Sequence, residues 1–429
     1  MSWRSSGPRI GKSRLPGQAL ALAALVTGLC GAEELSREAA PAWKSLPVVE
    51  PQGEKQHTGS FTLKDPSASG WKGPPFAYRE KTATGRKLAR VAVVIYNPSL
   101  ESEGGKRLIE FLKANDPVEY SRILANVIRE ASWGYLNYEI VDFITVDAFP
   151  EKVDGFRYTG ATFLEARKAQ KWQPATMSYR RMFEETKLLD RFRKEGLNEV
   201  WLWGSGGMHF DEFAGYLPNR YARFAPTDNP WFYRPYDIPP EIGRTVWVMG
   251  FNYEVGPDNM VHSYTHRVES MAALGPASGI WDTHQRRDPW NVFSWLELDH
   301  RGSPSMVGNC HVPPNGEGGY DYNNARRVLS WADSWYNFPD LRGAPRQVSS
   351  AEWGNNQFGY QKWILEHLPK YPGHTRYGYN NWWVYVANTD EDLPDWKPPD
   401  PESFHLPEGL PEPAPRNYAP AAGPPQIPR

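Results

Sequence analysis

Alternation of apolar runs with amphipathic segments is the feature that most limits the folds open to this chain of 429 residues. Four runs have the length and the β-branched or aromatic content of strands, at residues 91–96, 138–146, 199–203 and 245–250. Three other segments place apolar residues at helical spacing, over residues 118–131, 177–194 and 259–273. Strand–helix alternation of this kind predicts an α/β fold, with a mixed sheet covered by helices.

The start of the chain, residues 1–32, has the pattern of a secretory signal peptide. Basic residues precede an apolar stretch over residues 19–29, which is too short to span a bilayer. Small residues then predict cleavage near Ala32, and therefore a secreted or periplasmic protein. Lipid attachment at Cys30 is the alternative, and the bulky Leu29 before it argues against that alternative.

Proline-rich segments flank the patterned part of the chain. Residues 33–88 are polar and aperiodic, and we expect a linker or arm there. Residues 391–429 hold 12 prolines in 39 positions, which predicts an extended or disordered tail, pinned by Trp396 and Phe404. Between them we expect a single α/β domain over residues 89–390, whose second half consists of long, aromatic-rich loops.

The composition is unusual in its aromatic content. The chain has 19 Trp, 22 Tyr and 18 Phe, and its formal net charge is −2, which argues against a nucleic-acid partner. No segment predicts a transmembrane helix. Aromatic faces held in Pro- and Gly-rich loops suit contacts with sugar rings, so we expect a glycan or cell-wall polymer as partner. The side chains expected to be exposed for substrate binding are Trp281, Trp290, Trp353, Trp382 and Trp383, together with His209.

The helix expected over residues 259–273 carries a stripe of metal-binding side chains. With His262 at 0° on a helical projection, His266 falls at about 40° and Glu269 at about 340°. The apolar side chains lie on the other side, which leaves the stripe facing a cleft or solvent. Two histidines one turn apart can reach one ion at about 2.0–2.1 Å, with a carboxylate as third ligand. The sequence therefore predicts a divalent metal site, with zinc as the expected ion.

The same helix resembles the H-E-x-x-H helix of zinc metallopeptidases. In that family the glutamate is the general base, and here Ser263 takes its position. Peptidase-like chemistry would therefore need a base from elsewhere, and Glu254 and Glu269 are the candidates. An exposed polar helix face, with Glu269 paired to Arg267 or to a more distant cation, is the alternative interpretation.

Further candidates lie in loops on either side of this helix. Cys310 could close a metal site, although a lone cysteine more often fills a core, and we expect His311 to be a catalytic residue. Ser205 follows a strand, but the G-x-S-x-G spacing of a nucleophile elbow is absent. Additional candidates for ligands or acid–base groups are His284, Asp299, His300 and Asp321, and glycoside hydrolysis by paired carboxylates could use Glu254, Glu297, Asp299 or Glu352.

The motifs MGFNYE, HSYTHRVES, GNCHVPPN, YDYNN and NNWW resemble those of a group of uncharacterised secreted bacterial proteins, over about residues 90–390. The resemblance implies a shared fold and site and carries no activity. From the residues we expect a secreted, metal-dependent hydrolase of a polysaccharide or glycoconjugate. The alternatives are a non-catalytic glycan- or cell-wall-binding protein with a degenerate zincin-like site, and a metallopeptidase-like enzyme with a displaced general base.

Overall fold

The computed structural model describes residues 87–216, 236–274, 288–387, 403–408 and 410. The expected signal peptide, the proline-rich arm, most of the tail, Trp281, His284 and Trp396 lie outside the described residues. Within the described ranges, no helix combines the length and the apolar character needed to cross a membrane.

A five-stranded sheet with the order β4-β1-β5-β7-β6 forms the centre of the first half. Strands β1 (Lys87–Tyr96), β4 (Leu136–Val146), β5 (Glu199–Gly204) and β7 (Val246–Asn252) are parallel. Strand β6 (Phe213–Tyr216) pairs antiparallel with β7 at the edge. The predicted mixed sheet is confirmed; β6 was not predicted, because four residues are too few to show an alternation.

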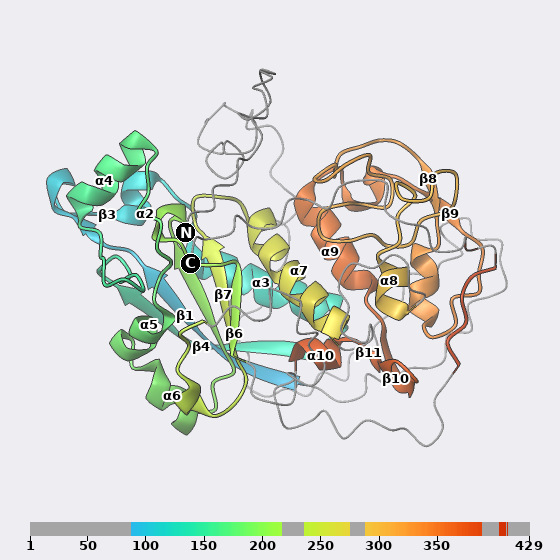
Figure 1. Ribbon diagram of the computed structural model, residues 1–429, viewed down its shortest axis with the longest axis horizontal. Helices are drawn as coiled ribbons and strands as arrows, with labels where there is room; N and C mark the ends of the chain where they lie inside the picture. The colour runs from blue at the N-terminus through green and yellow to red at the C-terminus, as the bar shows by residue number, and fades with distance from the viewer. Residues whose placement is uncertain (1–86, 217–235, 275–287, 388–402, 409, 411–429) are drawn as a thin grey trace, which may run out of the picture.

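Helices lie on both sides of this sheet (Figure 1). Helices α3 (Pro117–Ala131) and α7 (Pro257–Leu274) cover one side and confirm two predicted helices. On the other side, the helix predicted over residues 177–194 is wrong in one respect, because it divides into α5 (Tyr179–Glu185) and α6 (Leu188–Lys194). The break falls at Lys187, whose φ of 57° is incompatible with a continuous right-handed helix.

The second half contains more regular structure than its sequence indicates. Helix α9 (Gln357–His367) was not predicted, and it packs against α7 and α3. The second half also contains the α-helices α8 (Pro289–Phe293) and α10 (Trp383–Ala387) and two small ladders, β8 (Val328–Ser330) with β9 (Arg346–Val348) and β10 (Lys370–Thr375) with β11 (Gly378–Asn381). The remaining described α-helices and strands belong to the first half: α2 (Leu108–Leu112), α4 (Gly160–Ala169) and the ladder of β2 (Ser99–Leu100) with β3 (Lys106–Arg107). Phe404 of the tail packs against Phe338, as the pinning hypothesis expects.

Aromatic rings form the core of this second half. Four tryptophans predicted to be exposed are at most 4% exposed, so that prediction is wrong for Trp290, Trp353, Trp382 and Trp383. The Trp382 ring alone contacts Trp290, Phe293, Trp335 and Phe338. Where aliphatic stripes are few, such rings supply the buried area, because each one buries about 150–250 Å².

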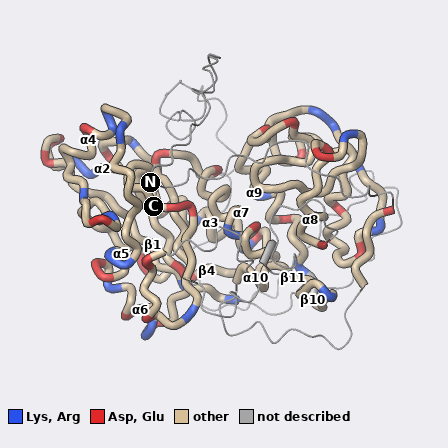
Figure 2. Tube along the Cα trace, viewed as in Figure 1, with Lys and Arg blue, Asp and Glu red and all other residues tan. Residues whose placement is uncertain are grey.

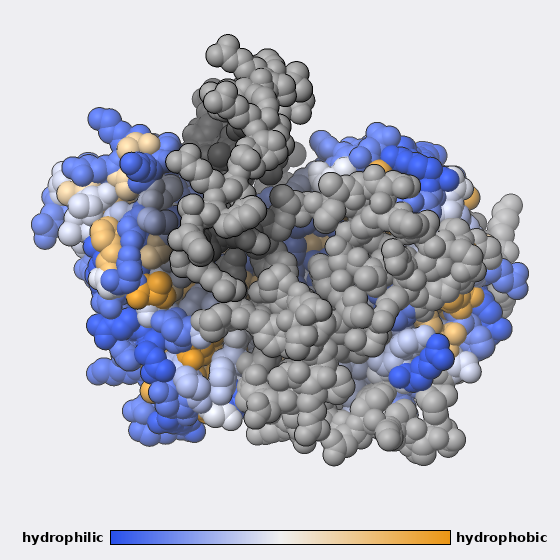
Figure 3. Space-filling model, in the orientation of Figure 1, coloured by the Kyte–Doolittle hydropathy of each residue, from blue (hydrophilic) through white to orange (hydrophobic). Residues whose placement is uncertain are grey.

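The described surface is polar and mixed in charge. Figure 2 shows Lys and Arg interspersed with Asp and Glu along the described chain, in keeping with the formal net charge of −2. Hydrophilic residues also dominate the described part of the face in Figure 3.

Candidate metal centre

The centre lies beyond the carboxyl ends of the parallel strands, where α/β sheets usually bind their ligands. Strand β7 ends at Asn252, and α7 begins five residues later and carries His262 and His266. A loop between α8 and β8 lies over this part of α7 and carries His311. The loop buries the stripe that was expected to face a cleft or solvent, and only 4% of His262 is exposed.

Three imidazoles converge on one point. Nε2 of His266 lies 3.1 Å from Nε2 of His262 and 3.0 Å from Nε2 of His311. A tetrahedral ion with bonds of about 2.0–2.1 Å separates its ligand nitrogens by about 3.3–3.4 Å, so a small shift of each ring would admit an ion. The one-turn spacing predicted from the sequence is therefore present as geometry, and His311 joins it from another element.

Glu269 connects the helix to the loop. Its Oε2 lies 3.0 Å from Nδ1 of His266, and its Oε1 accepts a hydrogen bond of 2.6 Å from the backbone N–H of Cys310. The carboxylate favours a proton on Nδ1 of His266, which leaves the Nε2 lone pair on the convergence point. Glu269 was predicted as a ligand and a catalytic group, and in this structure it positions His266 and the loop instead.

Cys310 lies on the opposite side of the His262 ring from the convergence point. Donor atoms of His262, His266, Cys310 and His311 all fall within 4.8 Å of one another, so this group could hold a metal ion. The Cys310 Sγ, however, is 3.5 Å from Nδ1 of His262, the nitrogen that faces away from the other two rings. The side-chain amide of Gln361 on α9 donates to the Cys310 carbonyl at 2.8 Å and lies 3.3 Å from the same Nδ1. The geometry therefore favours the three histidines as ligands.

Burial and neighbouring charges shift the pKa values of all three imidazoles. Burial, followed by the charges of His266 and His311, lowers the pKa of His262 to about 2. Burial and His266 lower that of His311 to about 4, against a raising effect of Glu269. Burial also lowers the pKa of His266, but the hydrogen bond to Glu269 and the charges of Glu212 and Glu269 outweigh it and raise the net value. Neutral His262 and His311 are in the protonation state that metal binding requires.

A carboxylate that the sequence did not single out completes the surroundings of the cluster. Oε2 of Glu212 lies 3.7 Å from Nε2 of His266, and 48% of its side chain is exposed. Its position is fixed by the sheet, because the Gly250 N–H donates to the Glu212 carbonyl at 2.8 Å. A Cβ at Gly250 would lie 2.1 Å from the Asp211 carbonyl oxygen, so this close approach requires glycine. The nearby D-E pair after His209 is the one sequence signal for Glu212.

The predicted base Glu254 is engaged elsewhere. It accepts a hydrogen bond from Ser205 at 2.5 Å and pairs with Arg167 at 2.5 Å. Both carboxylate oxygens of Glu254 are therefore engaged. The Ser205 hydroxyl, which was considered as a nucleophile, is engaged in the same hydrogen bond. Of these two carboxylates, Glu212 and not Glu254 lies beside His266.

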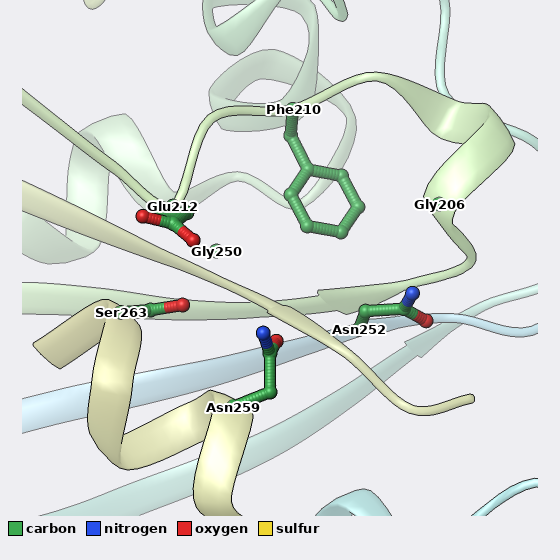
Figure 4. Close-up of a pocket in the computed structure, with 7 residues that line it drawn as sticks. All are labelled: Gly206, Phe210, Glu212, Gly250, Asn252, Asn259 and Ser263. Carbon is green, nitrogen blue, oxygen red and sulfur yellow. The ribbon is translucent and has the colours of Figure 1, made fainter. Parts of the chain in front are cut away.

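A small cavity adjoins the cluster (Figure 4). It measures about 110 Å³ and is lined by Gly206, Phe210, Glu212, Gly250, Asn252, Asn259 and Ser263. In Figure 4 the Ser263 hydroxyl and the two Asn amides point into the space from α7 and the end of β7, and the Phe210 ring closes it from the other side. Glu212 lines the cavity and also faces His266, so the cavity and the cluster share a wall.

Tyr320 covers the cluster from the solvent side. Its ring centroid lies 4.8 Å from that of His311 and 5.8 Å from that of His262, yet the residue is 56% exposed. Its φ of 63° is a strained value for a bulky side chain. The ring therefore combines a strained backbone with contacts to two of the three imidazoles.

The remaining candidates lie outside the metal-binding group. Burial and Lys152 lower the pKa of His209 to about 4, and Glu297 pairs with Arg326 at 2.7 Å. Glu352 pairs with Arg346, Asp321 accepts from Asn324, Asp299 is buried, and His300 stacks on Trp295. Arg267, which the alternative interpretation paired with Glu269, is instead bound to Glu199 on β5.

Comparisons of the chain with families of known proteins, with curated proteins and with solved structures found no match. The functional argument for this chain therefore rests on the site.

Proposed function

We propose that this protein is a divalent-metal-dependent hydrolase, in which His262, His266 and His311 hold the ion and Glu212 is the general base. The observation that carries the proposal is the convergence of three Nε2 atoms, with separations of 3.0 and 3.1 Å about His266. Imidazole ligands suit zinc, although copper, nickel and iron also bind to them. A zinc ion supplies Lewis acidity and brings the pKa of water toward about 7.

The chain's own residues account for the proton movements. Glu212 takes a proton from the attacking water, whose oxygen adds to the carbonyl carbon of the substrate. The same carboxyl then returns the proton to the leaving group as the scissile bond breaks. Water is thus consumed, its two hydrogens pass to the two products, and no further reactant is required. Glu269 holds His266 in the required tautomer throughout.

This proposal resembles the alternative of a metallopeptidase-like enzyme with a displaced base, because the carboxylate comes from the segment before β6 and not from the helix. Secretion and a polysaccharide or glycoconjugate substrate stay predictions from the sequence. The burial of four of the proposed sugar-binding tryptophans removes part of the argument for a sugar substrate and leaves the metal argument unchanged.

Metal analysis of the full chain, purified without a histidine tag, tests the proposal. We expect about one equivalent of zinc per chain in the wild type. His266→Ala should weaken zinc binding at least about 100-fold, because it removes the central ligand. His405→Ala, at an exposed histidine of the tail, is the matched control and should bind zinc like the wild type.

Activity distinguishes an enzyme from a binding protein. With 4-nitrophenyl acetate as an activated acyl probe, Glu212→Gln should lower kcat/KM by about 10²–10⁴-fold while it keeps its zinc. Glu317→Gln, at an exposed glutamate of the covering loop, should be unchanged. Zinc occupancy below about a tenth of an equivalent, with His266→Ala indistinguishable from the wild type, would overturn the proposal. Full occupancy without any Glu212-dependent turnover would favour the non-catalytic alternative.

A further inference from the structure

The cavity beside the metal centre contains a buried polar atom that the fold itself does not use. Ser263 is 1% exposed, and its Oγ has no hydrogen-bond partner among the described residues. A buried hydroxyl in this condition costs about 1–3 kcal/mol. Because Figure 4 shows this hydroxyl pointing into the cavity with the amides of Asn252 and Asn259, the group that fits there must offer hydrogen bonds.

The charges of the lining indicate a neutral group. None of the seven lining residues is Lys or Arg, so an anion would find no counter-charge among them. Glu212 is the one acid, and it faces the cluster as well as the cavity. An ammonium group offers donors alone and would leave the N–H groups of two Asn side chains unmatched, whereas an amide offers both a donor and an acceptor.

The size of the cavity suits a group of a few atoms. An apolar cavity of about 150 Å³ accommodates benzene, so a volume near 110 Å³ takes about four or five non-hydrogen atoms. An acetamide unit has this size. Its methyl group would pack on the Phe210 ring, which is the apolar part of the lining in Figure 4.

The position of the cavity ties it to the reaction. Asn259, Ser263 and His266 follow one another along α7 at spacings of four and three residues, so they share one side of the helix. The cavity therefore begins within one helical turn of the His262 and His266 imidazoles. A group held in it would lie beside Glu212, which also faces His266.

We propose that this cavity is the acyl subsite of the enzyme and that the substrate is a short-chain N-acyl amide, such as an N-acetyl group. The inference rests on the proposed hydrolase function and adds the substrate class. The reaction is then amide hydrolysis: the water oxygen bonds to the acyl carbon, the C–N bond breaks, and the proton held by Glu212 passes to the nitrogen. The products are a short carboxylic acid and a free amine.

A series of hydroxamic acids bound to the zinc-loaded full chain tests the subsite without a known substrate. The hydroxamate group binds the metal, and its acyl substituent is then left to occupy the cavity. We expect acetohydroxamate to bind at least about tenfold more tightly than benzohydroxamate, because the cavity excludes the larger ring. Ser263→Ala should weaken acetohydroxamate binding about five- to tenfold. Ser334→Ala removes another buried hydroxyl without a partner among the described residues, remote from the site in sequence, and should have no effect.

Two sources of the N-acyl group are distinguished by their products. Acetate release from an N-acetylglucosamine oligomer would identify amino sugars, and release from an N-acetyl amino-acid amide would identify peptides. Either result supports the inference. Equal affinity for the two hydroxamates, together with an unchanged Ser263→Ala variant, would overturn it.

Failure of this inference can be told apart from failure of the proposed function. If zinc binds and Glu212-dependent ester hydrolysis is present, but no preference for the short acyl group is seen, the hydrolase stands and the subsite does not. If His266→Ala binds zinc like the wild type, the metal centre itself fails.

Discussion

Helix α7 carries two clusters of buried ionisable groups, and the two are built on opposite principles. On one side, Arg267 is paired with Glu199 through two N···O distances of 2.7 Å, and Tyr138 donates to the same carboxylate at 2.9 Å. On the other side, three imidazoles turn the same kind of nitrogen toward one point. The first cluster neutralises itself with its own charges, and the second gathers lone pairs that a cation would satisfy.

The difference shows how a structural network can be told apart from a candidate functional one on a single helix. Burial alone would lower the pKa of Arg267, but Glu199, Tyr138 and Tyr264 raise it overall, so this cation is fixed. In the histidine cluster, burial and then the neighbouring rings lower the pKa values of His262 and His311, so two neutral imidazoles are held close together. Perturbed groups that disfavour one another are typical of functional sites.

The largest expected effect tests the cluster of Arg267 and Glu199. Arg267→Met should lower the free energy of unfolding by about 3–5 kcal/mol, because it leaves Glu199 buried without its cation. Denaturant unfolding with and without zinc measures it, and the loss should be the same in both. Arg301→Met, at an exposed arginine that pairs with Glu297, should change stability by less than about 0.5 kcal/mol. A loss that zinc reverses would show that the two clusters are not independent.

The second effect tests the cluster of three histidines. Glu269→Gln should weaken zinc binding about 10- to 100-fold, because the amide cannot hold His266 in its tautomer as a carboxylate does. Glu254→Gln should leave zinc affinity unchanged, since Glu254 is bound to Ser205 and Arg167. Isothermal titration measures both affinities. The reverse order of effects would return Glu254 to the site.

A second buried cation, Lys370, sharpens the comparison with Arg267 through its pH dependence. Burial lowers the pKa of Lys370 to about 7, against a raising effect of Glu366. Its ammonium group donates to the Glu366 carbonyl and, at 2.8 Å, to the Leu368 carbonyl, lies 4.8 Å from the Trp133 ring centre, and pairs with no carboxylate among the described residues. The folded state therefore binds fewer protons than the unfolded state between about pH 7 and 10.5, and this group makes stability rise with pH in that window.

The Lys370→Met variant isolates that contribution. Between pH 7.5 and 9, the wild type should gain up to about 1.4 kcal/mol per pH unit relative to the variant. Urea unfolding at a series of pH values measures the two slopes. Parallel slopes would mean that Lys370 keeps its proton in the fold, as Arg267 does.

The smallest effect concerns the residue that covers the histidines. Tyr320→Asn should raise the free energy of unfolding by about 0.5–1 kcal/mol, because asparagine tolerates a φ of 63° better than tyrosine does. The same variant should bind benzohydroxamate and acetohydroxamate less tightly, since the ring no longer covers His262 and His311. Lower stability would show that the ring contacts outweigh the strain.

Local patterns in the sequence predict much of the first half and the helical part of the site. The runs at residues 91–96 and 245–250 became β1 and β7, and the four-residue spacing of His262 and His266 became the convergence of two Nε2 atoms. These features were predictable because they depend on contacts within one helix or between adjacent strands of the sheet.

The features that the sequence did not predict depend mainly on contacts between residues far apart in the chain. Glu212 is 54 residues from His266, and its place depends on a backbone contact with Gly250 that no periodicity encodes. The tryptophans were misplaced because a ring that can stack on sugar can also fill a core, and Trp382 is surrounded by other rings. Helix α9 was missed because apolar and aromatic residues occur around much of it, which hides a helical stripe.

Gly250 has a consequence for how this chemistry can vary. The distance between Glu212 and the histidines depends on a backbone contact. The backbone of residues 211–212 packs directly against β7 at Gly250, where a side chain would collide with it. The spacing of the proposed base and the proposed ligands is thus set by the backbone of the sheet. Side chains around the cavity can change while this spacing stays the same, whereas a single methyl group at position 250 would alter it.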